Sequence, residues 1–334
     1  MKILISTGIY PPQIGGPAQY AKNLREVLEK KGHKIFLTTF NLERYLPTGV
    51  RHLYFFIKII PRVVLSHGAF IFDTYSIGFP TVLACKIFSR KSVIRTGGDF
   101  LWEQYVERTR KKVLLRNFYE TEKGNFSRKE KIIFTITRWT LHNTSHVIFS
   151  TEWQRDIFIR AYKIDKEKTS IVENFYGPKE QASQGTSKVF IASTRNLVWK
   201  NLDMLRKIFG STRAKHSDIE LFTENVSFSV FMKKMKECYA VVLVSLGDIS
   251  PNMILDAIRN NKPFICTREV GIYERIKDAG MFVDPLNETE IQSALENILT
   301  KEGYARAEEK VKTFNFTHTW DEISSEFMNI FSLL

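Results

Sequence analysis

Short apolar runs alternate with amphipathic helical patterns along most of this chain, and the alternation constrains the fold more than any other feature. An apolar run from Lys2 to Thr7 precedes a turn-rich loop, a helix from about Ala18 to Lys31 and a second run from Lys34 to Phe40. Repeated strand–helix–strand units of this kind predict a parallel sheet covered by helices on both faces. We therefore expect an α/β protein built on Rossmann-like sheets.

The alternation falls into two series, separated by a segment of different composition. Residues Tyr176 to Ser187 are rich in Gly, Pro, Ser and Gln, which is typical of an interdomain linker. Strand-like runs follow at Val189–Ser193, Ile219–Phe222, Ala240–Ser245 and Pro263–Cys266. The sequence thus predicts an N-terminal domain over residues 1–178, a C-terminal domain over residues 186–316 and a final helix from about Thr317.

Charge and cysteine content limit the partners and the compartment. A formal net charge of +13 favours an anionic partner, such as nucleic acid, an acidic membrane surface or a phosphorylated small molecule. Cys85, Cys238 and Cys266 form no CxxC pair, which argues against a disulfide framework or a zinc site. The N-terminus has no leader-like apolar region, and no apolar stretch reaches 18 residues. We expect a cytoplasmic protein that does not span a membrane.

The loop from Tyr10 to Pro17 is the first candidate ligand site. Open parallel sheets bind ligands at the carboxyl ends of their strands, and Gly15 and Gly16 lie between the first strand and its helix. Paired glycines let the backbone approach a phosphate, and the free helix N–H groups favour an anion. The alternative is an ordinary tight loop. The pattern is not GxGxxG, so a nicotinamide cofactor is disfavoured.

The second candidate loop carries two cations. Arg195 and Lys200 follow the apolar run Val189–Ser193, where both can converge on a diphosphate and stabilise it as a leaving group. The alternative is a solvated basic loop.

The third candidate combines a helix start with two carboxylates. Ser250 suits an N-cap and Pro251 the first helical position. This start leaves three backbone N–H groups free, those of Asn252, Met253 and Ile254. Asp248 and Asp256 can accept hydrogen bonds from sugar hydroxyls. The alternative is an ordinary N-cap with a surface aspartate.

The fourth candidate is the stretch after the run Ser92–Arg95. Gly97 and Gly98 permit a close backbone approach, and Asp99 can position a hydroxyl nucleophile or act as a base. In isolation, an aspartate in a turn is the simpler explanation.

Taken together, the four loops resemble those of the family 4 glycosyltransferases, which have the GT-B fold of two Rossmann-like domains facing across a cleft. The resemblance implies that Gly15 and Gly16 contact the donor phosphates. It also implies that Arg195 and Lys200 grip the diphosphate.

Further site roles follow from the resemblance. The family's Glu-x7-Glu motif is matched in spacing by Asp248 and Asp256, the first meeting the sugar and the second the ribose. Backbone contacts to the base are expected near Asn225 and Val226. The resemblance also implies that residues 317–334 form a helix that crosses back to the N-terminal domain.

The activity implied is a retaining transfer of a sugar from a nucleoside-diphosphate sugar to a hydroxyl acceptor. The chain has no DxD motif, so neither a metal nor another cofactor is expected. Family habit suggests a lipid-linked or polysaccharide-precursor acceptor in cell-envelope or glycan biosynthesis, used at the inner face of a membrane.

Three departures from the family pattern keep alternatives open. Both glutamates are aspartates, the Gly-rich run between them reads Ile-Ser-Pro-Asn-Met, and Asp99 stands where many relatives place a histidine. A nucleotide-sugar epimerase, a phosphorylase and a catalytically silent nucleotide-binding relative therefore remain alternatives.

Residues Arg108 to Arg138 form a basic segment with interleaved apolar residues, among them Val113, Leu114, Leu115, Phe118, Tyr119 and Phe126. Such a segment can lie on an anionic bilayer, or it can be a solvated helix whose apolar residues face the N-domain core. No nucleic-acid-binding module accompanies the charge, so a nucleic-acid partner is disfavoured.

Overall fold

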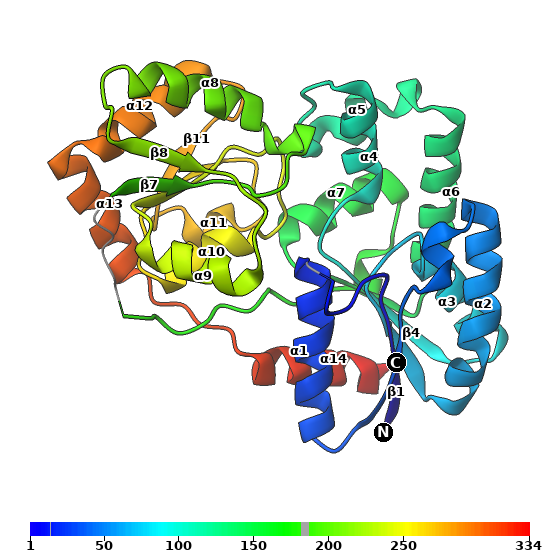
Figure 1. Cartoon of the computed structure of the whole chain (residues 1–334). Coiled ribbons are helices and arrows are strands. Elements are labelled where there is room, and N and C mark those ends of the chain that lie inside the picture. The colour runs from blue at the N-terminus through cyan, green and yellow to red at the C-terminus, as the bar shows by residue number, and fades with distance from the viewer. Residues whose placement is uncertain (14, 182–186) are drawn as a thin grey trace. The chain divides into compact units, whose positions relative to one another are not determined.

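The computed structural model describes residues 1–13, 15–181 and 187–334, which form two compact units, each built around a parallel sheet (Figure 1). The first unit contains Met1–Leu101, Gly124–Phe175 and His318–Leu334, and the second contains Trp102–Lys123 and Tyr176–Thr317. The predicted α/β fold with two parallel-sheet domains is confirmed. Part of the predicted linker, residues 182–186, lies outside the described residues.

The sheet of the first unit has the strand order β2-β1-β3-β4-β5-β6, and every pairing is parallel. Each strand coincides, within two residues, with an apolar run of the sequence. The strands are β1 (Lys2–Ser6), β2 (Lys34–Thr38), β3 (Gly68–Ile71), β4 (Lys91–Thr96), β5 (His146–Phe149) and β6 (Thr169–Ile171).

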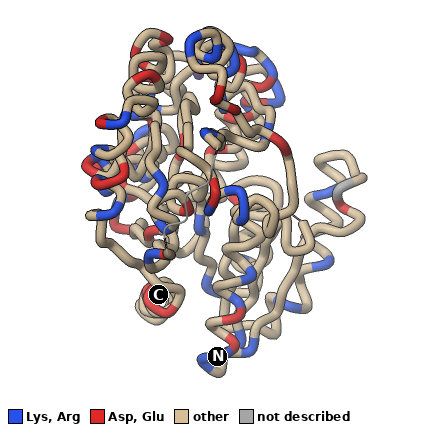
Figure 2. Tube along the Cα trace, turned by 60° about the vertical axis from the view of Figure 1, so that its left-hand side comes forward, with Lys and Arg blue, Asp and Glu red and all other residues tan. Residues whose placement is uncertain are grey.

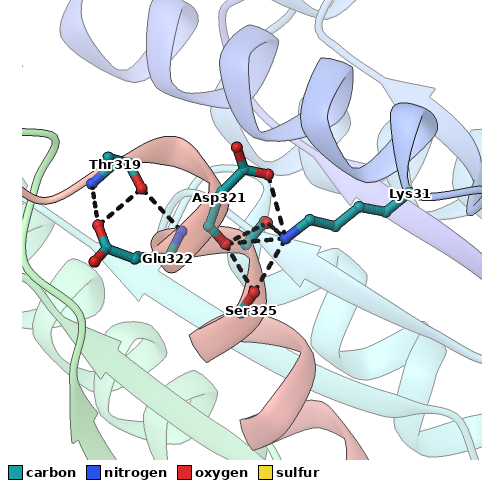
Figure 3. Close-up of polar contacts among 6 residues, drawn as sticks. Lys31, Thr319, Asp321, Glu322 and Ser325 are labelled. Atoms are coloured by element: carbon teal, nitrogen blue, oxygen red, sulfur yellow. Dashed lines mark hydrogen bonds and ion pairs between the residues drawn. The ribbon is translucent and has the colours of Figure 1, made fainter.

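Helices α1 (Gly16–Lys30) and α14 (Trp320–Leu333) cover one face of this sheet. Phe327 and Phe331 of α14 are fully buried, and both rings pack edge-on against Phe70 of β3. At the other end of α14, Lys31 donates hydrogen bonds to the Asp321 carbonyl and to two serine hydroxyls (Figure 3). The return of the last helix to the first unit is therefore confirmed.

Helices α2 (Thr48–Leu65), α3 (Gly78–Ile87) and α6 (Arg128–Asn143) pack side by side on the same unit, with α2 and α3 against its sheet (Figure 1). Helix α2 was not predicted from the sequence, because it has apolar residues on two sides instead of one stripe. Helix α7 (Glu152–Tyr162) connects β5 to β6. No helix in the described part of the chain is long and apolar enough to cross a membrane.

The second unit has the strand order β11-β10-β9-β7-β8, again all parallel. The strands are β7 (Lys188–Ile191), β8 (Ile219–Phe222), β9 (Ala240–Leu243), β10 (Phe264–Thr267) and β11 (Met281–Val283). One face is covered by α8 (Leu202–Arg213), α12 (Glu288–Leu299) and α13 (Lys301–Thr313). The other is covered by α9 (Phe228–Glu237), α10 (Asn252–Arg259) and α11 (Tyr273–Ile276).

Residues Trp102–Lys123 belong by their contacts to the second unit, although they precede its sheet by more than sixty residues. This inserted segment spans most of α4 (Phe100–Thr109) and all of α5 (Phe118–Thr121). Its apolar side chains point inward, and Leu115, Phe118 and Tyr119 are buried. The predicted exposure of these side chains toward a bilayer is therefore wrong. Their alternative burial in the N-domain core is also wrong for Leu115, Phe118 and Tyr119, which belong to the second unit, whereas Phe126 is buried in the first unit.

Candidate nucleotide site of the second unit

The strand order of the second unit creates a place for a ligand. Strand β8 adds to one side of β7 and β9 to the other, so the connections leaving β7 and β9 run in opposite directions. Open parallel sheets bind ligands outside the carboxyl ends of the strands at such a switch point. The loops after β7, β9 and β10 carry the side chains described next.

Lys200 and Asp248 form an ion pair at this point. The Lys200 Nζ lies 2.6 Å from Asp248 Oδ2, and their side chains are only 9% and 15% exposed. Lys200 Nζ also lies 4.0 Å from the centroid of the Trp199 ring. A lysine ammonium has three donors, so Lys200 can hold Asp248 and still donate to a phosphate oxygen.

Backbone hydrogen bonds tie the three loops together and fix this pair. The Leu246 N–H donates to the Trp199 carbonyl at 2.8 Å. The Asp248 N–H donates to the Glu269 carbonyl at 2.8 Å, and the Gly271 N–H donates to the Asp248 carbonyl at 2.9 Å. These main-chain bonds hold the backbone on both sides of the pair.

Arg195 is placed differently from Lys200. Its side chain is exposed, and its Cζ lies 5.9 Å from the centroid of the Trp199 ring. Within the described part of the chain, Arg195 makes no ion pair. The two predicted cations therefore both lie beside Trp199, with Lys200 buried in an ion pair and Arg195 exposed.

The start of α10 differs from the prediction. Pro251 is the N-cap, Asn252 is the first helical residue, and no side chain caps the helix. Ser250 is not the cap because the preceding residues are held in an extended bridge, Asp248 pairing with Val270. The Ile254 N–H is also not free, since it donates to the Pro251 carbonyl at 2.9 Å.

The remaining N–H groups at this helix start are those of Asn252 and Met253, the first two residues of the helix. Asn252 is exposed, whereas Met253 packs partly against the core. The α10 tip is therefore an anion-favouring end with two backbone donors.

Asp256 lies in the second turn of α10. Burial raises the pKa of its carboxyl to about 6, and nearby Arg259 lowers it in part. Hydroxyl groups that donate hydrogen bonds to this buried carboxylate would stabilise its charged form, and a ribose would supply such hydroxyls.

Three buried polar atoms near the pair have no hydrogen-bond partner among the described residues: Trp199 Nε1, Ser245 Oγ and Ser250 Oγ. Buried polar groups are nearly always hydrogen-bonded, so each such atom needs an explanation. They lie in the same β7 and β9 loops as Lys200 and Asp248, where a polar ligand would satisfy them.

The inserted segment buttresses these loops. Glu107 Oε1 accepts a hydrogen bond from the Val198 N–H at 2.6 Å, at the start of the short turn that carries Lys200. The Leu115 N–H donates to the Leu246 carbonyl at 3.3 Å, and the Trp102 ring lies 5.5 Å from that of Trp199.

Gly247 is the point of closest approach in this packing. A Cβ at this position would lie 2.6 Å from Leu115 Cβ and 3.2 Å from the Trp102 ring. The residue next to Asp248 must therefore be glycine for the segment to pack as it does.

Glu269 joins the same cluster from the β10 loop and was not singled out from the sequence. Its Oε2 lies 2.7 Å from Arg116 Nε, and its side chain is 7% exposed. Burial raises the pKa of Glu269, and the ion pair with Arg116 lowers it in part. No local sequence signal could have revealed this pair, because its members are 153 residues apart.

The remaining predicted donor residues of this unit follow β8. Asn225 is exposed, whereas Val226 packs partly against the core that α9 and α10 share. Both lie at the same edge of the sheet as Lys200, since all five strands are parallel.

The other predicted residues lie in the first unit. Gly15 is the N-cap of α1 and Gly16 its first residue, two positions earlier than the predicted helix start. Asp99 is 3% exposed directly before α4 and is engaged with its surroundings. We find Gly97 pressed against Arg95, since a Cβ at Gly97 would lie 2.6 Å from an Arg95 Nη1.

Arg95 was not predicted as a functional residue. Its buried guanidinium lies 4.0 Å from the centroid of the Tyr20 ring and donates a hydrogen bond to Asn174. The Gly97 backbone lies against this Arg95 guanidinium.

Among residues 1–13, 15–181 and 187–334, no group of three or more His, Cys, Asp or Glu side chains converges as a metal site would require.

Solved structures of glycosyltransferases align with nearly the entire chain. Sucrose-phosphate synthase from Thermosynechococcus elongatus has a TM-score of 0.69 at 11% identity, covering 99% of this chain and 98% of its own. Anabaena HepE in complex with UDP and glucose has a TM-score of 0.69 at 13% identity, with full coverage of both chains.

The fold is that of the GT-B glycosyltransferases. WaaG, a glycosyltransferase of lipopolysaccharide biosynthesis, aligns with a TM-score of 0.67 at 11% identity over 98% of this chain and 99% of its own. The sequence itself matches no protein-family model and no curated protein.

Proposed function

We propose that the protein is a glycosyltransferase that uses a nucleoside-diphosphate sugar. The Lys200–Asp248 pair carries this proposal, because it stands at the switch point of the sheet beside the open start of α10. The pair offers a cation for the diphosphate and a carboxylate for sugar hydroxyls within one hydrogen bond of each other.

The chemistry needs no metal. Lys200, Arg195 and the N–H groups of the α10 tip would neutralise the diphosphate while the bond from the anomeric carbon to the phosphate oxygen breaks. A hydroxyl oxygen of the acceptor forms the new bond to that carbon. Its proton passes to the departing phosphate, so attack on the same face retains the anomeric configuration.

The acceptor we propose is a hydroxyl on a lipid-linked or polysaccharide precursor, used at the inner face of a membrane. In the first unit, Gly15 and Gly16 would contact the donor phosphates. Asp99 would orient the acceptor hydroxyl. UDP is the first nucleotide to test, since HepE was solved with UDP-glucose.

The test is calorimetric titration of the protein with UDP, GDP and ADP in the presence of EDTA. We expect one of them to bind, and Arg195→Ala and Lys200→Ala each to weaken that binding by about 10- to 100-fold, the loss of a charge-assisted hydrogen bond. Arg213→Ala is the matched control, because Arg213 is exposed at the far end of α8.

Two results would count against the proposal. The first is the absence of binding of all three nucleotides, and the second is equal loss in the Arg213 control. Product analysis with a bound donor then separates the alternatives: an isomerised donor indicates an epimerase, a sugar phosphate a phosphorylase, and no turnover a silent relative.

A further inference from the structure

Exposed apolar side chains gather on the outer surface of α2, α3 and α6 in the first unit. Leu53 and Ile57 are each 61% exposed, and Ile132 of α6 is 56% exposed. The full set is Val50, Leu53, Tyr54, Ile57, Val64, Leu65, Ile87, Phe88 and Ile132. We call this the α2–α3–α6 surface.

Helix α2 is apolar on two sides. One stripe, His52, Phe55, Ile59 and Val63, is buried against the unit. A second stripe of large apolar residues, from Val50 to Leu65, faces away from it at helical spacing. A helix that covers a core presents polar residues on its outer side, so a contiguous apolar stripe there marks an interaction surface.

Helix α3 contacts both α2 and α6. Arg90 Nη2 donates to the Val64 carbonyl at 2.9 Å, joining the ends of α3 and α2. Lys86 of α3 donates to the Asn143 side chain of α6, and its Nζ lies 6.0 Å from the centroid of the Trp139 ring. Helix α3 therefore lies between α2 and α6, and it meets α6 at the C-terminal end of that helix.

The charge of this surface has one sign. The three helices contain eight Lys and Arg residues: Arg51, Lys58, Arg62, Lys86, Arg128, Lys129, Lys131 and Arg138. Their single carboxylate, Glu130, is 3% exposed and is used in the capping box of α6 with Ser127. No exposed carboxylate accompanies the cations on these helices.

The α2 cations Lys58 and Arg62 are engaged in contacts within the unit, whereas the α6 cations are exposed to solvent. Lys58 pairs with the buried Glu43 at 2.6 Å, and Arg62 donates to Thr38 Oγ1 at 3.2 Å. Arg128, Lys129, Lys131 and Arg138 of α6 are exposed to solvent, as is Lys86 of α3. The apolar stripe thus lies on α2, the free cations lie on α6, and the exposed Lys86 of α3 already donates to Asn143.

We propose that the α2–α3–α6 surface docks onto a bilayer that contains anionic phospholipid. The apolar side chains would enter the interface, and the free cations would meet the lipid phosphates. Two copies of so cationic a surface repel each other, which disfavours a homodimer. The inference deepens the proposed function, because a lipid-linked acceptor needs an enzyme at the bilayer surface.

The experiment is vesicle flotation without donor or acceptor, comparing phosphatidylcholine vesicles with vesicles that also contain phosphatidylglycerol. We expect at least tenfold more protein bound to the anionic vesicles at low salt, and a fall as salt rises. The double variant Leu53→Glu with Ile57→Glu is expected to remove this binding. Phe228→Glu is the control, since Phe228 is also 61% exposed but lies on α9.

The charge contribution has its own pair of variants. Lys129→Glu with Lys131→Glu is expected to weaken binding to anionic vesicles at least tenfold, whereas Lys301→Glu on α13 leaves it unchanged. All substituted side chains are exposed, so circular dichroism and melting curves should match those of the parent protein.

The inference is wrong if the parent protein does not bind anionic vesicles, or if the α2 variant binds them as well as the Phe228→Glu control does. It is also wrong if light scattering shows a dimer that the α2 variant converts to a monomer. UDP titration of the same variants keeps the two proposals apart. Vesicle binding without nucleotide binding would overturn only the transferase function. Nucleotide binding without vesicle binding would overturn only the docking surface.

Discussion

The burial of the Asp256 carboxyl lowers the stability of the protein at neutral pH. Burial raises its folded-state pKa to about 6, whereas its unfolded-state value is about 3.9. The folded protein therefore holds the proton more tightly, so stability falls as pH rises from about 4 to about 6. Above pH 6 the full loss remains, on the order of 3 kcal/mol for a shift of about two units.

We expect Asp256→Asn to stabilise the protein without nucleotide at pH 7.5 by about 1–3 kcal/mol. The gain should fall to a few tenths of a kcal/mol near pH 4, where the parent carboxyl is protonated in the folded state and about half protonated in the unfolded state. Denaturant unfolding at the two pH values measures the difference, and nucleotide titration should show weaker binding by the more stable variant. Equal stability of both proteins at pH 7.5 would contradict the assigned role of burial.

At the scale of elements, the inserted segment holds the Lys200 turn through Glu107. Glu107→Ala removes the acceptor for the Val198 N–H, which we expect to weaken nucleotide binding about 5- to 20-fold through misplacement of Lys200. Glu107→Gln keeps an acceptor oxygen and should retain most of the affinity. Calorimetry on both variants provides the measurement, and identical losses in the two would show that the contact does not position Lys200.

All strands except β11 were predictable from sequence because buried parallel strands are short, contiguous apolar runs. The helices α2 and α6 were not, since α2 is apolar on two sides and the apolar residues of α6 are interleaved with cations. Strand β11 was not predicted from its three residues.

Within the candidate site, Arg195, Lys200 and Asp248 could be proposed from spacing after predicted strands. The contacts of Glu107, Leu115 and Glu269 could not, because they join segments far apart in the chain. The start of α10 was placed one residue early, since local cap preferences at Ser250 do not register the bridge between Asp248 and Val270.

At the scale of the whole molecule, the charge is spread along the trace and is not confined to one segment (Figure 2). The C-terminal stretch His318–Leu334 differs from the basic chain as a whole, because it has three acidic residues and no Lys or Arg. Lys31 of the first unit pairs with one of these acids, Asp321, at 3.5 Å.

The first unit also depends on α14 for its core. Phe327→Ala should destabilise this unit by about 3–5 kcal/mol, because Phe327 is fully buried against Phe70 and Tyr20. The exposed Asn329→Ala in the same helix is the control. Thermal unfolding is measured with and without nucleotide, which should raise the melting temperature of the second unit only. Phe327→Ala should lower the melting temperature of the other transition, the one that nucleotide does not raise. If Phe327→Ala lowers the melting temperatures of both transitions equally, the two units unfold as one.

The division of the first unit into three stretches of chain has a consequence for biosynthesis. A ribosome makes the whole of the second unit before it makes α14, so the second unit has all its parts first. Domains usually fold in the order in which they are made. In this protein the domain that begins first is finished last, and its sheet must wait, with the Phe70 face uncovered, until the helix that seals it emerges.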